Sequence, residues 1–166
     1  ETAAFVRRAA ELARWGEAVP AGRHRGFAFH RTYGTKIAQV AEISLDGDRL
    51  RVQRVICVVD CGRAVNPDIV RSQMESGIVY GASAALFGAI TFREGAVVQS
   101  NFHDQPIVRM AQSPEIDVLI LDSTAAPTGV GEPATAPIAP AIGNAIAAAT
   151  GVRVRRLPLS RQFVIV

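Results

Sequence analysis

The strongest constraint on the fold is a pair of β-rich runs separated by a tight-turn sequence. Residues 27–45 and 50–60 are rich in β-branched and apolar side chains, and Asp-Gly-Asp at 46–48 is typical of a hairpin turn. The apolar content of the second run predicts a central strand. Tyr-Gly-Thr at 33–35, near the middle of the first run, indicates a bulge or a close approach of another backbone.

Helical patterns precede and follow these strands. Residues 2–16 place apolar side chains at helical spacing. Asn66 before Pro67 is typical of a helix N-cap followed by the first helical residue, and it predicts a helix over 67–90. A second apolar helix is expected over 136–150, because a glycine directly follows this alanine-rich run.

Three shorter β segments complete the pattern. We expect a hairpin around Glu94, a strand over 115–121 and a last strand over 152–158. This mixture predicts an α+β fold, with β-hairpins and a mixed sheet packed against two apolar helices. The expected organisation is a helix and linker from a preceding segment over 1–22, a main segment over 23–160 and a tail over 161–166.

Composition excludes several classes of protein. Of the 166 residues, 49% are hydrophobic and 20% are charged, so the chain can bury enough apolar surface to fold. The net charge is only +3, and no arginine cluster has an aromatic platform beside it, which argues against nucleic-acid binding. The uncharged windows 76–92 and 133–152 are too short, or too interrupted by proline, to span a membrane, and we interpret both as buried helices.

The cysteines and histidines indicate neither a disulfide nor a metal site. On a regular strand Cys57 and Cys61 share a face about 13 Å apart, which is beyond disulfide reach. The spacing of His24, His30 and His103 does not match a set of metal ligands. The sequence therefore predicts no metal-ligating side chains.

A carboxylate flanked by glycines, in Thr-Gly-Val-Gly-Glu-Pro at 128–133, is the sharpest chemical feature. The two glycines let the backbone approach a ligand, and Pro133 holds Glu132 on an extended backbone just before a helix. A fixed carboxylate suits a general base, and a dry pocket raises the pKa of such a group into a useful range. A plain turn with a solvated glutamate is the alternative.

Gln73 and two glycines mark the expected helix 67–90. The Gln73 amide can donate and accept hydrogen bonds at once. Gly77 and Gly81 are four residues apart, so they leave a groove on one helix face. Either a neighbouring helix or a cofactor could fill this groove.

Four motifs stand in series along the chain. They are VDCGRAVNP at 59–67, VRSQMESGI at 70–78, SNFHD at 100–104, and GVGEP at 129–133 followed by APA at 139–141. In order and spacing they resemble the C-terminal part of the molybdopterin-binding large subunit of the xanthine dehydrogenase and aldehyde oxidase family, and within it the isoquinoline 1-oxidoreductase β branch. The resemblance covers about residues 23–158. The chain departs from the family pattern at Ser76, Ala134 and Gln105, where the family usually has glycine, glycine and an aromatic residue.

The resemblance implies a molybdenum hydroxylase, an oxidoreductase that hydroxylates an N-heterocycle or an aldehyde with oxygen derived from water. It implies that Glu132 is the general base acting on a molybdenum-bound hydroxide, and that Gln73, Gly77 and Gly131 bind the cofactor. The cofactor implied is a molybdenum–pterin group, molybdopterin cytosine dinucleotide. No side chain of this chain is expected to ligate the metal.

The resemblance also implies partners. These are the remainder of the large subunit and a small 2Fe–2S subunit, because this chain lacks the cysteines that iron–sulfur clusters need. The short length and the absence of an initiator Met indicate a segment of a longer subunit that is inactive by itself. The sequence leaves the compartment open between a bacterial cytoplasm and a periplasm. The alternative hypothesis is a non-catalytic or degenerate α+β module that acts in folding or assembly.

Overall fold

One mixed sheet organises the chain, and the computed structural model describes all residues, 1–166. The strands lie in the order β1-β2-β3-β6, and β7 also pairs with β3. The bounds are β1 Arg23–Thr32, β2 Thr35–Asp46, β3 Arg49–Asp60, β6 Glu115–Ile120 and β7 Val164–Ile165, with a separate hairpin of β4 Phe92–Arg93 and β5 Ala96–Val97. The predicted central position of the second β-rich run is confirmed, since β3 pairs with three other strands.

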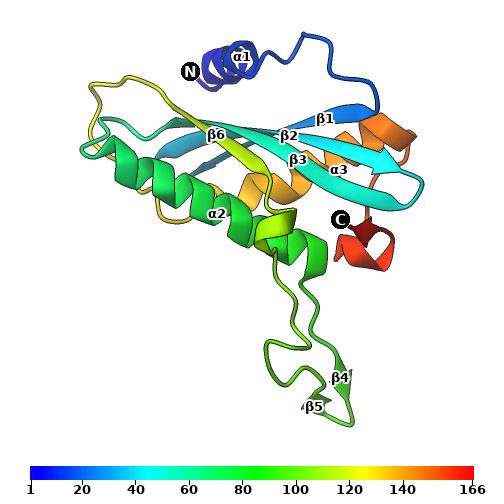
Figure 1. Ribbon diagram of the computed structural model, residues 1–166. Helices are drawn as coiled ribbons and strands as arrows, with labels where there is room; N and C mark the ends of the chain where they lie inside the picture. Colours follow the sequence, from blue (N-terminus) through cyan, green and yellow to red (C-terminus); the bar gives the residue numbers. More distant parts are fainter.

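Helices cover both faces of the sheet (Figure 1). The helices are α1 Thr2–Leu12, α2 Pro67–Phe87 and α3 Thr135–Thr150, with short 3-10 turns η1 Met110–Gln112 and η2 Leu159–Arg161. In Figure 1, α2 and α3 lie below the sheet and α1 lies above it. The predicted α+β class is confirmed, and α1 is a third helix packed on the sheet. None of the helices combines the length and the apolar composition that a membrane span needs.

Two tight turns connect the first three strands, which are antiparallel. The hairpin predicted at 46–48 is confirmed, with Gly47 at φ 59°. Of the two alternatives at 33–35, the bulge is wrong, because Tyr33 and Gly34 form a hairpin turn at φ 51° and 81° that divides the first run into β1 and β2. The close approach of another backbone is confirmed, since the Gly129 N–H donates to the Tyr33 carbonyl at 3.3 Å. A register shift does occur, but between Glu42 and Ile43.

Local chemistry explains where the long helices begin. The Asn66 side-chain oxygen accepts hydrogen bonds from the backbone N–H groups of Asp68 and Ile69, both at 3.1 Å, so the predicted N-cap is confirmed. The helix expected over 136–150 is confirmed as α3, and its two prolines do not break it. Pro137 is its third residue, where no intrahelical partner is needed, and the helix continues through Pro140.

The last strand is Val164–Ile165, so the strand expected over 152–158 is wrong. The alternation of apolar and basic residues there reflects packing beside α3. Val154 contacts the core, and the Arg153 guanidinium donates to Asn144 Oδ1 at 2.7 Å. The sheet positions near the β2–β3 turn are taken by β7 instead, which pairs with Arg49 and Leu50.

The main core lies between the sheet and the pair α2 and α3. Its largest fully buried side chains come from all of these elements, and include Ile37, Ile43, Leu50, Met74, Ile78, Leu86, Ile138, Ile142 and Ile146. A smaller cluster beneath α1 joins Phe5 and Ala9 to Ala38 and Val58 on the other sheet face. Because both sheet faces are covered, β2 is buried over most of its length.

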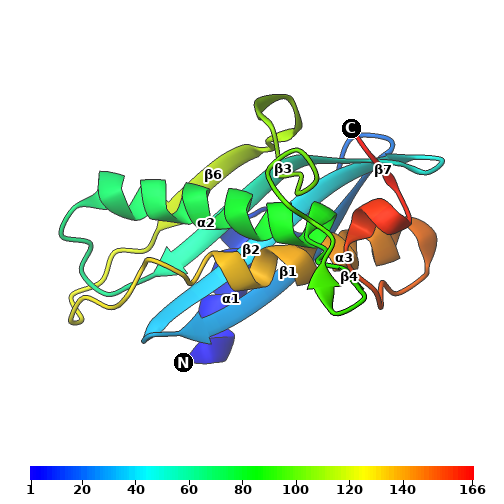
Figure 2. The same ribbon diagram turned by 90° about the horizontal axis from the view of Figure 1, so that it is seen from below.

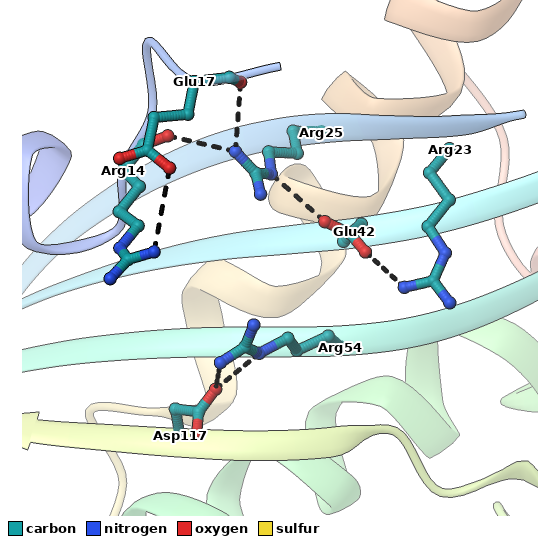
Figure 3. Close-up of polar contacts among 7 residues, drawn as sticks. All are labelled: Arg14, Glu17, Arg23, Arg25, Glu42, Arg54 and Asp117. Atoms are coloured by element: carbon teal, nitrogen blue, oxygen red, sulfur yellow. Dashed lines mark hydrogen bonds and ion pairs between the residues drawn. The ribbon is translucent and has the colours of Figure 1, made fainter. Parts of the chain in front are cut away.

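On the outer sheet face, beyond the apolar contacts beneath α1, side chains form ion pairs (Figure 3). Glu42, only 6% exposed, accepts hydrogen bonds from Arg23 at 2.6 Å and from Arg25 at 3.2 Å. Arg25 also donates to the carbonyls of Arg14 and Glu17, so it fixes the segment that links α1 to β1. Glu42 is the buried charged side chain of the domain.

Glu42 predicts a pH dependence of stability. Burial raises the pKa of this carboxyl, but the hydrogen bonds and charges of Arg23 and Arg25 outweigh burial and hold the pKa below its usual range. The paired carboxylate therefore stabilises the fold above the unfolded-state pKa, and this stabilisation is lost as the pH falls through the lower folded-state pKa. Glu42→Gln should cost about 1 kcal/mol at pH 7 and make the acid-induced loss shallower. Thermal unfolding of the assembled protein between pH 7 and pH 3 measures both effects.

The matched control is Glu115→Gln, which removes an exposed carboxylate from β6. It should leave both stability and its pH dependence unchanged. An acid-induced loss for Glu42→Gln as steep as that of the wild type would show that this network does not control the pH response.

Candidate functional site

The connection between β6 and α3 ends in a loop that is held against the end of the sheet. We call residues 128–134 the glycine loop. The Thr128 N–H donates to the Cys61 carbonyl at 2.9 Å, and the Gly129 N–H donates to the Tyr33 carbonyl at 3.3 Å. The Thr35 hydroxyl, which is fully buried, contacts Thr128 Oγ1 at 2.6 Å and donates to the Gly129 carbonyl at 2.7 Å. Figure 2 shows the yellow connection running along this end of the sheet before it enters α3.

A buried amide fixes the other end of the glycine loop. Gln39 lies on β2 with no exposed surface, and its Nε2 donates to the Ala134 carbonyl at 2.8 Å. Its Oε1 is buried without a hydrogen-bond partner. The Thr135 N–H donates to the Glu132 carbonyl at 2.9 Å as α3 begins. The loop is therefore anchored on both sides of Glu132.

Glu132 itself lies at the surface, where its carboxylate accepts a hydrogen bond from the Tyr33 hydroxyl at 3.2 Å. The hydrogen bond and the negative charge of Glu132 raise the pKa of Tyr33. Because the carboxylate is exposed, these 166 residues do not supply the dry pocket that the sequence argument invoked. The structure does supply a fixed backbone and one hydrogen-bond donor.

The start of α3 fills the groove between the two glycines of α2. A Cβ at Gly77 would lie 2.8 Å from the Ala134 Cβ, and a Cβ at Gly81 would overlap the Thr135 carbonyl oxygen. Of the two occupants left open, a neighbouring helix is the one present. This close approach explains why residue 77 is glycine without requiring a ligand.

Gln73 lies on α2 one turn before Gly77, about 6 Å along the helix axis on the same face. Its side chain is exposed. Gly77, one turn further along, is the residue that contacts Ala134. Gly131 is also exposed, and no atom lies within 4 Å of the position a Cβ would take. Gln73, Gly131 and Glu132 are therefore accessible, while Gly77 is buried.

The sequence does not identify three residues of this site, Tyr33, Thr35 and Gln39, beyond placing the first two where another backbone could come close. All lie in or just before β2, and the last two are fully buried polar residues in a strand that is otherwise mostly apolar. That exception to the apolar pattern is the signal that could have identified them, because a buried polar group needs a hydrogen-bond partner.

The thiols are not part of a reactive site. Cys57 and Cys61 are both buried and free. Desolvation raises the pKa of Cys57 to about 12, and burial also raises the pKa of Cys61, so neither thiol forms a thiolate at neutral pH. The structure brings together no group of three His, Cys, Asp or Glu side chains suited to hold a metal ion.

A groove of about 760 Å³ runs between α2 and the segment 105–108. Gln105, where the family usually has an aromatic residue, lines it together with Glu75 and Ser76. The Gln105 Oε1 is buried without a hydrogen-bond partner. This departure from the family pattern therefore leaves one buried acceptor unsatisfied within the chain.

The comparisons with known proteins agree with the motif series. A family model described as the molybdopterin cofactor-binding domain matches residues 7–114. The chain is therefore a member of this domain family, found in the large subunits of xanthine dehydrogenase-type molybdenum hydroxylases.

Particular relatives refine this placement. The chain is 39% identical to isoquinoline 1-oxidoreductase subunit beta of Brevundimonas diminuta over 95% of this chain and 21% of that protein. It is 36% identical to a membrane-bound aldehyde dehydrogenase (pyrroloquinoline-quinone) of Gluconacetobacter polyoxogenes, again over 95% and 21%. The crystal structure of quinoline 2-oxidoreductase from Pseudomonas putida 86 shares the fold with a TM-score of 0.70 at 24% identity, over 75% of this chain and 17% of that chain. The chain spans about a fifth of the length of these curated relatives.

Proposed function

We propose that this chain forms the cofactor-facing segment of a molybdenum hydroxylase, with Glu132 as the general base. The observation that carries the proposal is the exposed Glu132 carboxylate, which projects from a loop anchored on both sides and accepts a hydrogen bond from Tyr33. An anchored carboxylate can accept a proton without first paying for loop ordering. The match to the family model ends at residue 114, before Glu132, so the assignment of this role rests on the motif GVGEP at 129–133 and on the loop geometry.

The accessible groups fit a pterin cofactor. Gln73 would hold it through an amide that both donates and accepts, and Gly131 through an unobstructed backbone. Gly77 would contribute indirectly, by letting the glycine loop lie against α2. When bound, the molybdenum–pterin group, which we propose is molybdopterin cytosine dinucleotide, supplies the transferred oxygen and takes up the electrons of the substrate. Glu132 contributes a carboxylate oxygen that takes up the proton released in that step.

The substrate class in this proposal is an N-heterocycle or an aldehyde. One relative is named for isoquinoline oxidation and another for aldehyde oxidation, and the chain is similar to both over nearly its whole length. The iron–sulfur clusters that carry electrons onward would lie on a small 2Fe–2S partner subunit.

An exposed apolar arm supports packing against the remainder of the large subunit. Residues 88–108, which we call the arm, include the β4–β5 hairpin and project away from the sheet (Figure 1). Phe92 and Phe102 on the arm are 71% and 80% exposed. Further exposed apolar side chains on the arm are Ile90, Val97, Val98 and Ile107. Apolar surface gathered in one place is typical of an interface rather than of a free surface.

Elemental analysis tests the proposal directly. The species that contains this chain would be purified from its own host, and its molybdenum and iron contents measured together with its native mass. We expect near-stoichiometric molybdenum, with iron, in an assembly much larger than 17.7 kDa. A metal-free monomer of this chain alone would instead support the non-catalytic module in folding or assembly. An assembly that contains pyrroloquinoline quinone and no molybdenum would contradict the proposed cofactor.

A further inference from the structure

Tyr33 occupies a backbone conformation that its side chain does not favour. It is the first residue of the two-residue turn between β1 and β2, at φ 51°. Turns with positive φ at both positions prefer Asn, Asp and Gly, because the left-handed conformation is unfavourable for residues with a larger side chain. A bulky residue at such a position suggests that its side chain serves a purpose.

Tyr33 forms two hydrogen bonds with the glycine loop. Its carbonyl accepts from the Gly129 N–H at 3.3 Å, and its hydroxyl donates to Glu132 Oε2 at 3.2 Å. A Cβ at Gly129 would lie 3.0 Å from the Tyr33 Cβ, so the loop needs a small residue there to reach the turn. Tyr33 and Glu132 are 99 residues apart in the sequence. The β1–β2 turn therefore contacts a carboxylate from a distant part of the chain.

We propose that Tyr33 is a positioning residue for Glu132, holding the carboxylate in one orientation. The inference rests on the proposed role of Glu132 as general base. A free glutamate side chain samples several rotamers, and a donated hydrogen bond restricts them.

No other charged group competes for this carboxylate. None of the ion pairs of the chain includes Glu132, and Tyr33 is the titratable side chain that contacts it. Tyr33 is 63% exposed, so its side chain is accessible to solvent. The phenol is thus the one group in this chain placed to control the orientation of Glu132.

The first test reads the contact itself, independently of turnover. In the assembled enzyme, the ultraviolet titration of tyrosinate in the wild type minus that in Tyr33→Phe isolates the Tyr33 phenol. The same difference taken in a Glu132→Gln background reports the phenol without the carboxylate. We expect the midpoint to move to lower pH in the Glu132→Gln background, since the pKa of Tyr33 is raised by Glu132. Equal midpoints would overturn the inference.

The second test reads the consequence for catalysis. Tyr33→Phe should lower kcat/KM about tenfold, the effect of one hydrogen bond to a charged group at the low end of its range. The loss should fall on kcat rather than on KM, with molybdenum content unchanged. Tyr80→Phe removes the other tyrosine hydroxyl of the chain, from the exposed face of α2, and should change nothing.

The outcomes separate this inference from the function it rests on. If Glu132→Gln abolishes turnover while Tyr33→Phe keeps the wild-type kcat and kcat/KM, the inference is wrong and the base role stands. If Glu132→Gln keeps near-normal turnover, the base role is wrong, and the proposal that Tyr33 positions a catalytic base is overturned with it, even where the titration confirms the contact.

Discussion

Glu132→Gln is expected to lower the turnover of the assembled enzyme by about 100-fold to 10,000-fold, the contribution typical of a positioned general base. Glutamine keeps the shape of the side chain and can still accept from Tyr33, but it cannot take up a proton. The residue is exposed, so the substitution leaves no buried group unpaired and folding should be unaffected. The measurement is steady-state kcat together with molybdenum content, which should remain at the wild-type level.

The control for this variant is Glu115→Gln, which removes another exposed carboxylate far from the glycine loop in sequence. It should keep wild-type turnover. Near-normal turnover of Glu132→Gln would remove Glu132 from the catalytic role. Lost turnover accompanied by lost molybdenum would instead assign the carboxylate to cofactor retention.

Gly26→Ala should destabilise the fold strongly. Gly26 lies on β1 where α3 crosses it, and a Cβ there would overlap the Ala141 carbonyl oxygen and the Ala145 backbone nitrogen. Backbone atoms of a helix cannot rotate away as a side chain can, so α3 would have to lift from the sheet. We expect a loss of at least about 3 kcal/mol, seen as a lower unfolding temperature and a lower soluble yield of the assembled protein.

Gly143→Ala is the matched control within α3. A Cβ at Gly143 would meet only the Val154 Cβ, at an ordinary contact distance of 3.8 Å. Alanine favours a helix interior over glycine by about 1 kcal/mol, so this variant should be as stable as the wild type or more stable. Equal losses for both variants would show that α3 does not press on β1 as closely as described.

Residues near one another in sequence determined much of the secondary structure. The β2–β3 turn follows from the conformational freedom of Gly47, and the start of α2 follows from the Asn66 cap. The same local logic failed at Tyr33 and Gly34, because the tyrosine is an uncommon choice for the left-handed turn it adopts. It failed again over 152–158, where an alternating pattern serves packing on a helix and not strand pairing.

By itself, the sequence determined the family and singled out Glu132, because both depend on short motifs whose residues are close together along the chain. Only the tertiary structure decided what surrounds that carboxylate. Tyr33, Thr35 and Gln39 contact the glycine loop from 93 to 99 residues away, and the groove on α2 is filled by a helix that begins nearly 60 residues later. Contacts between distant segments depend on how the sheet and helices pack, and no local periodicity encodes that packing.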